Sequence, residues 1–196
     1  IGKDVPYVLL AAIAEQSEDT IRRGLAHLQE TEFLYETQLF PDLEYTFKHA
    51  LTHEVTYGSL LQERRKTLHA QIVSAIERLY PDRLSEQVER LAHHALRGEV
   101  WDKALSYFRQ AGEKAATRSA NRKAIVDFEQ ALSALAHLPE RKENIEAAID
   151  LRFRVRTCLI QLGDFAPILQ RLREAEALAR AIGDERRLGW VHSYLC

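Results

Sequence analysis

The chain has 196 residues, of which 46% are hydrophobic and 29% charged, a composition typical of a globular protein with one full domain or two small ones. Its 27 Lys and Arg residues nearly balance 29 Asp and Glu residues, which argues against non-specific nucleic-acid binding by the whole chain. No apolar run approaches the roughly 20 residues of a membrane span. We therefore expect neither nucleic acid nor a membrane as a partner.

The chain contains no Met and only two cysteines, Cys158 and Cys196. Two cysteines are too few for a disulfide framework, and the apolar helical pattern around Cys158 predicts a core position for that residue. Because a natural chain begins with Met, we expect this sequence to be part of a longer protein.

Two helices are predicted at the start of the chain. Residues 5–14 are short and apolar, and Pro6 suits a first helical turn. Ser17 is a candidate N-cap, and the acidic residues directly after it favour the positive end of a helix. Apolar residues then follow at helical spacing, namely Ile21, Leu25 and Leu28.

A β-hairpin and a long helix are predicted next. Two runs with alternating aromatic and β-branched residues, 33–39 and 44–48, flank a Pro-Asp turn signal at 41–42. Helical spacing returns over 50–79 and stops at Pro81, because proline cannot continue the helical hydrogen bonds. The order helix, helix, hairpin and helix is that of a winged helix-turn-helix domain.

Every segment after Pro81 carries helical periodicity. Glycines at 98, 163 and 183 fall just past the ends of such segments, where helix caps favour glycine. The predicted helices span 84–97, 101–118, 121–137, 143–162, 165–182 and 184–196.

Part of this helical region repeats itself. The pattern of Ala and Phe in 101–111 recurs in 121–131, and Gly163-Asp164 recurs as Gly183-Asp184. Recurrence at the length of a helix and its turn is typical of stacked helical hairpins. The sequence therefore predicts a mainly α fold, with a winged helix-turn-helix and its β-hairpin over 1–80 followed by an α-α superhelical array. We expect this array, over 81–196, to be truncated.

Both halves resemble known families. The segment 121–132, with Pro139 after it, is similar to the second half of a tetratricopeptide repeat (TPR). The segment 32–69 contains Phe47-Lys48-His49-Ala50-Leu51-Thr52 and resembles the winged-helix end of a STAND-type AAA ATPase module. In that bacterial class, a class III adenylate/guanylate cyclase-like domain precedes the ATPase module, and TPR units follow it.

The resemblance implies a non-catalytic regulatory or sensor segment of a cytoplasmic signal-transduction ATPase. Its partners would be the ATPase core of the same polypeptide and an unknown protein on the repeat surface. The sequence contains no G-x-x-x-x-G-K-[ST] loop and no cyclase motif. We therefore expect no enzymatic activity and no cofactor in this chain, with ATP or ADP and Mg²⁺ bound only by the full-length parent.

His49 is the candidate nucleotide-sensing residue, with Lys48 beside it. The predicted helix start after the hairpin offers free N–H groups and partial positive charge, which suit an anion. Lys48-His49-Ala50-Leu51 resembles the Met-His-Asp motif in which a histidine contacts the β-phosphate of ADP, although Ala50 replaces the aspartate. We hypothesise that His49 and Lys48 contact phosphate in the full-length protein. The competing interpretation is a histidine that caps the helix or packs on the hairpin.

A metal site is a weaker interpretation of the same stretch. His49 and His53 would share a helix face, but Tyr57 stands where the second histidine of an H-E-x-x-H motif is needed. Two histidines without a third ligand rarely hold zinc, so we expect no metal. No Gly-x-Ser-x-Gly elbow is present either, so an enzyme such as a metal-dependent hydrolase lacks support.

The repeat region is expected to present a concave surface to a protein partner. Tyr107 and Trp190 are candidate exposed anchors for that partner, although aromatic residues can instead pack between repeats. We favour packing for Trp101, which lies at a predicted helix start.

A DNA-binding transcriptional regulator is the alternative function. The predicted helix over 19–30 would enter the major groove, and it carries Arg22 and Arg23. Acidic residues lie at both ends of that helix and around 40–44 in the predicted wing, where they would face phosphates unfavourably.

Overall fold

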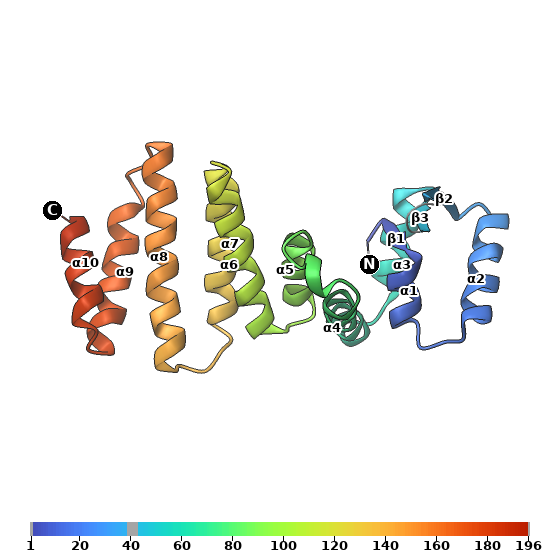
Figure 1. Ribbon diagram of the computed structural model, residues 1–196, viewed down its shortest axis with the longest axis horizontal. Coiled ribbons are helices and arrows are strands. Elements are labelled where there is room, and N and C mark those ends of the chain that lie inside the picture. Colours follow the sequence, from blue (N-terminus) through green and yellow to red (C-terminus); the bar gives the residue numbers. More distant parts are fainter. Residues whose placement is uncertain (1, 39–42, 196) are drawn as a thin grey trace. The chain divides into compact units, whose positions relative to one another are not determined.

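The computed structural model describes residues 2–38 and 43–195 (Figure 1). These residues are mainly helical, as predicted, with ten α-helices, one short 3-10 helix and a three-stranded antiparallel sheet. They form two compact units, one of residues 1–84 and 97–99 and the other of residues 85–96 and 100–196. None of the helices in the described part of the chain has the length and apolar content needed to cross a bilayer.

The helix predicted over 5–14 is present but starts at Tyr7, because a short strand precedes it. Strand β1 (Asp4–Pro6) precedes helix α1 (Tyr7–Ile13). Val5 pairs with Tyr45 of the sheet, and the hydroxyl of Thr46 donates a 2.5 Å hydrogen bond to Asp4. Cross-strand pairing therefore outweighs the helical spacing of the first apolar residues. Helix α2 (Glu18–Glu30) begins as predicted, since the backbone N–H of Thr20 donates to the Ser17 hydroxyl.

The sheet has the order β1-β3-β2, with β2 at Leu34–Gln38 and β3 at Glu44–Phe47. Both strands of the predicted hairpin are confirmed, and the predicted turn at 41–42 lies outside the described residues. The third strand, β1, is three residues long and ends in proline, so its own sequence carries little strand signal. A buried cluster joins α2 to the sheet, made of Val5, Ile21, Leu25, Leu34 and Tyr45.

The helix predicted over 50–79 is two helices, α3 (Ala50–Ser59) and α4 (Gln62–Leu79). Leu60 and Leu61 between them have extended backbone, with ψ of 138° and 145°. Near the end of α3, the hydroxyl of Ser59 donates to the carbonyl of Thr56, and local bonds of this kind compete with helix continuation. Arg65 then donates from Nε to the Leu60 carbonyl, which gives that backbone group a partner outside the helix.

Helix α4 is the main buried helix of the first unit, and it packs against α1. Its inner face contributes Ile72, Val73 and Ile76, and α1 contributes Leu9, which is fully buried. Pro81 ends α4 as predicted and begins the 3-10 helix η1 (Pro81–Arg83).

The second unit is built from six helices that follow one another along the chain (Figure 1). From α6 onward each helix packs against the next. Most of the predicted bounds agree with the structure to within three residues, except that the first helix starts at 88 instead of 84. The helices are α5 (Val88–Arg97), α6 (Trp101–Thr117), α7 (Asn121–Leu135), α8 (Lys142–Leu162), α9 (Ile168–Ala181) and α10 (Glu185–Leu195).

The repeated Ala and Phe pattern lies in the core between α6 and α7. Ala104 and Ala124 are fully buried, and Phe128 is 1% exposed. Gly112 of α6 lies so close to Phe128 that a Cβ at Gly112 would meet the ring at 2.5 Å. Small residues therefore let the two helices approach around one large ring.

Two of the three predicted glycine caps are confirmed. Gly163 and Gly183 have φ of +70° and +65°, the left-handed conformation that glycine adopts without steric cost. At the end of α5, Glu99 takes the left-handed conformation instead of Gly98. The Val100 N–H donates to the Ala95 carbonyl there, so the chain turns one residue later than the glycine indicates.

Candidate functional site

His49 lies between strand β3 and helix α3, at the position predicted from the sequence. Its backbone is extended, with φ of −126° and ψ of 128°, and its exposed side chain makes no capping hydrogen bond. Lys48 is also exposed, but its Nζ forms an ion pair with Glu32 at 2.7 Å. This hydrogen bond lowers the pKa of Glu32. A phosphate at this position would therefore meet an available imidazole, and it would compete with Glu32 for Lys48.

His53 packs among aromatic rings one turn further along α3. Its ring meets Phe47 edge-on at 5.2 Å and stacks on Tyr57 at 6.3 Å. The Tyr57 hydroxyl lies 3.0 Å from Nε2 of His69, a buried residue of α4. Within residues 2–38 and 43–195, no cluster of three or more His, Cys, Asp or Glu side chains is arranged to hold a metal ion.

The arginines of α2 are engaged with neighbouring groups. Arg22 donates two hydrogen bonds to Glu18, at 3.0 and 2.7 Å, and its guanidinium lies 5.5 Å from the centre of the Tyr7 ring. Arg23 donates to the Asp19 carbonyl. A DNA phosphate or base would have to displace the Glu18 carboxylate to reach Arg22.

A groove in the second unit is the strongest candidate for a binding site. It has a volume of about 450 Å³, and its lining residues come from α6, α8 and α10, the alternate helices of the series. A smaller cavity of about 300 Å³ shares Glu113, Arg154 and Thr157 with it. That cavity also reaches Phe128 of α7 and Cys158 of α8. We call the 450 Å³ cavity the α6–α8–α10 groove.

One arginine of the groove, Arg187, has a structural role because it joins helices through ion pairs. Arg187 of α10 is buried, and its guanidinium donates to both oxygens of Asp150 at 2.9 and 2.7 Å and to Asp184 at 2.5 Å. The bonds to Asp150, together with those to Asp184, raise the pKa of Arg187. Its charge is therefore fixed and already neutralised by carboxylates of α8 and of the turn before α10.

Three other arginines of the groove are exposed and have no such partner. They are Arg109 of α6, Arg154 of α8 and Arg186 of α10. In the part of the chain that the structure describes, none of the three forms an ion pair with a carboxylate. Glu113 is the remaining acidic residue of the lining besides Asp150. The groove therefore carries net positive charge in a chain whose overall charge is −2.

The α10 end of the groove is aromatic. Trp190 is 41% exposed, as predicted, and meets Phe153 edge-on at 6.2 Å. Tyr194 meets the same ring at 5.4 Å. Two guanidinium groups lie over these rings, Arg186 at 4.9 Å from Trp190 and Arg156 at 3.9 Å from Tyr194. An amphipathic wall of this kind suits a ligand with both apolar and anionic groups.

The expected exposure of Tyr107 is wrong, because the side chain is buried at 8% exposure in the core that α6 contributes to. Trp101 packs as expected, with its ring stacked on His137 at 3.8 Å. Cys158 is buried in α8 as predicted, and burial raises the pKa of its thiol.

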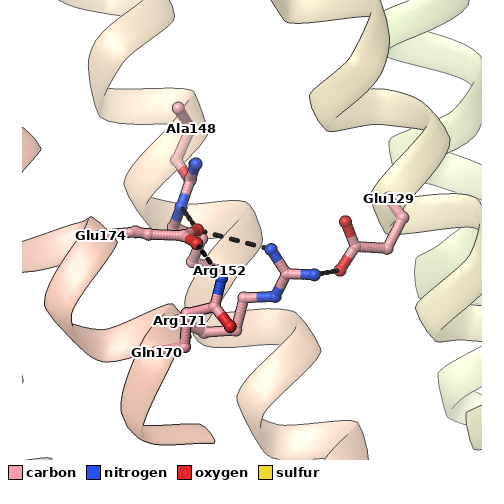
Figure 2. Close-up of polar contacts among 6 residues, drawn as sticks. All are labelled: Glu129, Ala148, Arg152, Gln170, Arg171 and Glu174. Atoms are coloured by element: carbon pink, nitrogen blue, oxygen red, sulfur yellow. Dashed lines mark hydrogen bonds and ion pairs between the residues drawn. The ribbon is translucent and has the colours of Figure 1, made fainter. Parts of the chain in front are cut away.

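The arginines between α7, α8 and α9 contrast with those of the groove. Figure 2 shows Arg171 between Glu129 of α7, at 2.7 Å, and Glu174 of its own helix, at 3.4 Å. Arg152 of α8 donates to Glu174 at 3.0 Å and to the Ala148 carbonyl at 2.9 Å. These cations hold helices together, whereas Arg154, two residues further along α8, forms no ion pair within the described part of the chain.

Sequence reasoning missed the groove arginines. A signal for one wall was present, because Arg186, Trp190 and Tyr194 are spaced by four residues and share one helix face. The contributions of Arg109 and Arg154 come from two other helices, and only their packing reveals that these side chains share a groove with that wall.

The comparisons with known proteins identify no family for this chain. No family model matches the sequence. It is similar to an uncharacterized protein, R02095, of Rhizobium meliloti (strain 1021), with 27% identity over 140 residues. The aligned segment covers 71% of this chain but only 14% of that relative, so the chain spans a small part of the curated protein it matches.

Proposed function

We propose that this chain is a non-catalytic regulatory segment of a larger signal-transduction ATPase. In this proposal residues 1–80 are a winged-helix domain that reports the nucleotide state of an ATPase core on the same polypeptide. Residues 81–196 are a TPR-like array that binds a protein partner. ATP or ADP and Mg²⁺ would belong to the parent protein, with His49 as this chain's phosphate contact.

The α6–α8–α10 groove is the observation that carries the proposal. An array of helical hairpins presents alternate helices on one face, and the groove is lined by alternate helices. The buried Ala and Phe of α6 recur in α7, as they would between units of one repeat. A groove with unpaired cations and exposed aromatic rings fits protein recognition better than catalysis.

Support for a docked module comes from α3, the helix that follows His49. It contributes no buried residue, and Leu51 and Val55 on one of its faces are 69% and 63% exposed. Leu61 just after the helix is 80% exposed. Apolar side chains gathered on one surface are typical of a face that another protein module covers. The order α1, α2, hairpin and α3 is also the order expected of a winged helix.

The mechanism follows from the positions of His49 and Lys48. A core docked on α3 would bring its bound nucleotide to the imidazole, which makes no capping hydrogen bond to α3. The phosphate would compete with Glu32 for the Lys48 ammonium. The contact would stabilise the docked arrangement with ADP bound, and its loss would favour the undocked arrangement, which is a shift between two states.

The test is ADP affinity, measured by calorimetry on the full-length natural protein and on the 196-residue chain. We expect the full-length protein to bind ADP, and His49→Ala to weaken that binding about tenfold, the range of a lost charge-assisted phosphate contact. His27→Ala, an exposed histidine of α2, is the matched control and should leave the affinity unchanged. Equal ADP affinity of the wild-type and His49→Ala proteins would overturn the reporter role.

A further inference from the structure

We propose that the α6–α8–α10 groove binds an extended acidic peptide segment of a partner protein, with an aromatic or large apolar side chain of that segment at the α10 end. The inference rests on the protein-interaction part of the proposed function, and it is independent of nucleotide.

The arginines of the second unit differ in whether they have carboxylate partners. Arg152, Arg171 and Arg187 each hold one or more carboxylates of their own chain. Arg109, Arg154 and Arg186 line one depression and hold none among the described residues. These three exposed cations outnumber the one acidic lining residue that is not paired with Arg187, Glu113, so a ligand that supplies carboxylates lowers the free energy of the groove.

The groove crosses three helices. Its lining runs from Arg186 on α10 across Arg154 on α8 to Arg109 and Glu113 on α6. The smaller cavity, which shares Arg154 with the groove, is lined by Phe128 as well. A depression that crosses three helices fits an extended chain, because carboxylates spaced along that chain can reach successive arginines.

The α10 end of the groove presents aromatic rings to solvent. Trp190 and Tyr194 present exposed ring surface beside the half-buried Phe153. Exposed tryptophan and tyrosine next to arginine are the residue types that dominate binding energy at protein interfaces. An aromatic or large apolar side chain of the ligand would cover these rings and release their water.

The same residue types bind single-stranded nucleic acid, but the charges favour a peptide. A nucleic-acid groove follows the backbone with continuous positive charge. Here Glu113 lies in the lining near the exposed arginines, while Asp150 is already paired with Arg187. Glu113 would repel a phosphate backbone, whereas a peptide can place a neutral residue beside it.

The test uses the 196-residue chain and three pools of short fluorescein-labelled peptides, with fluorescence anisotropy as the readout. The acidic pool contains Asp, Glu, Phe, Leu, Gly and Ser; the basic pool replaces the acids with Lys, and the neutral pool with Gln. We expect the acidic pool to bind about tenfold more tightly than the neutral one, with an affinity that falls as salt increases.

Charge-reversal variants distinguish binding in the groove from a general effect of the net charge of the chain. Arg154→Glu and Arg186→Glu should each lower the affinity of the chain for the acidic pool about tenfold. Arg122→Glu on α7 and Arg173→Glu on α9 make the same charge change at exposed positions outside the groove, and should leave binding unchanged. Trp190→Ala should lower the affinity for the acidic pool. It should leave unchanged the affinity for an acidic pool that lacks Phe and Leu. Circular dichroism checks that each variant remains folded.

Three outcomes would overturn the proposal. They are an acidic pool that binds no better than the basic pool, control variants that weaken binding as much as the groove variants, and an oligo-dT strand that binds more tightly than any peptide. None of these depends on His49, and the ADP measurement does not depend on the groove. Failure of the acidic-peptide assignment is therefore distinguishable from failure of the nucleotide-reporter function.

Discussion

Arg187 and Asp150 lie 37 residues apart in the sequence and form a two-pronged hydrogen-bonded pair between α10 and α8, at 2.9 and 2.7 Å. The guanidinium also holds Asp184, which precedes α10, while the Asp184 carboxylate accepts from the Arg187 backbone N–H at 2.9 Å. One buried side chain therefore fixes both the start of the last helix and its attachment to α8.

Replacement of Arg187 by Ala should destabilise the second unit by about 2–3 kcal/mol, below the cost of breaking a fully buried pair because Asp150 is half-exposed. Arg187→Lys should recover only part of this, since an ammonium cannot reproduce the planar two-pronged contact. Urea denaturation followed by circular dichroism measures both changes. Arg173→Ala, at an exposed position of α9, is the control. An unchanged midpoint for Arg187→Ala would show that packing alone holds α10.

Stability in acid should depend on Asp184. Its pKa is lowered, first by the hydrogen bond from the Arg187 backbone N–H and then by the Arg187 side chain. A carboxyl with a lower pKa in the folded state stabilises the fold above its unfolded pKa. That contribution is lost as the pH falls through the folded value. We therefore expect the wild-type Tm to fall below about pH 4, the ordinary range of an aspartate.

The matching variant is Asp184→Asn, which retains an oxygen to accept from the Arg187 N–H but carries no charge. It should have a lower Tm than wild type at neutral pH, and its Tm should fall less between neutral pH and acid. Melting curves recorded by circular dichroism across that range compare the two proteins. Parallel curves at all pH values would show that the Asp184 charge is unimportant.

The close approach of α6 and α7 gives a further prediction. Gly112→Ala should destabilise the protein by about 1–3 kcal/mol, because the added methyl meets the ring of the buried Phe128. Gly189→Ala is the matched control, since a Cβ there meets nothing within 4 Å. As a helical glycine replaced by alanine, it should stabilise by about 0.5–1 kcal/mol.

Thermal denaturation of both glycine variants tests this contrast. The double variant Gly112→Ala with Phe128→Leu should recover part of the loss attributable to the clash, relative to the sum of the single changes. Two glycine variants with the same Tm would mean that the Phe128 ring moves aside at no cost.

Local spacing predicted most helices of this protein, because their signals lie within each helix. The caps at Ser17, Gly163 and Gly183 and the buried Ala and Phe pattern were read in this way. The errors occurred where distant contacts decide the structure. Val5 pairs with Tyr45, forty residues away in the sequence, and so joins a sheet. Tyr107 is of a residue type that is common at protein interfaces, but in this fold its side chain is buried.

The candidate site was less accessible from sequence than the fold. His49 could be located because it follows a strand and precedes a helix, both of which have local signals. The groove arginines come from three helices, and what distinguishes Arg154 from Arg152 is that Glu174 lies beside only one of them. Such pairing depends on helix rotation, which a pattern of apolar residues fixes too coarsely to assign individual charges.

The break at Leu60 and Leu61 separates α3 energetically from α4. Helix α3 buries no residue, and among the described residues its side-chain links to α4 include the hydrogen bond of Tyr57 with His69 and the stacking of Arg65 on Tyr57. Unwinding α3 would therefore expose little new apolar surface, and its amides should exchange with solvent sooner than those of α4. The helix that begins beside His49 is thus the part of its unit whose order a bound partner can set at the lowest free-energy cost.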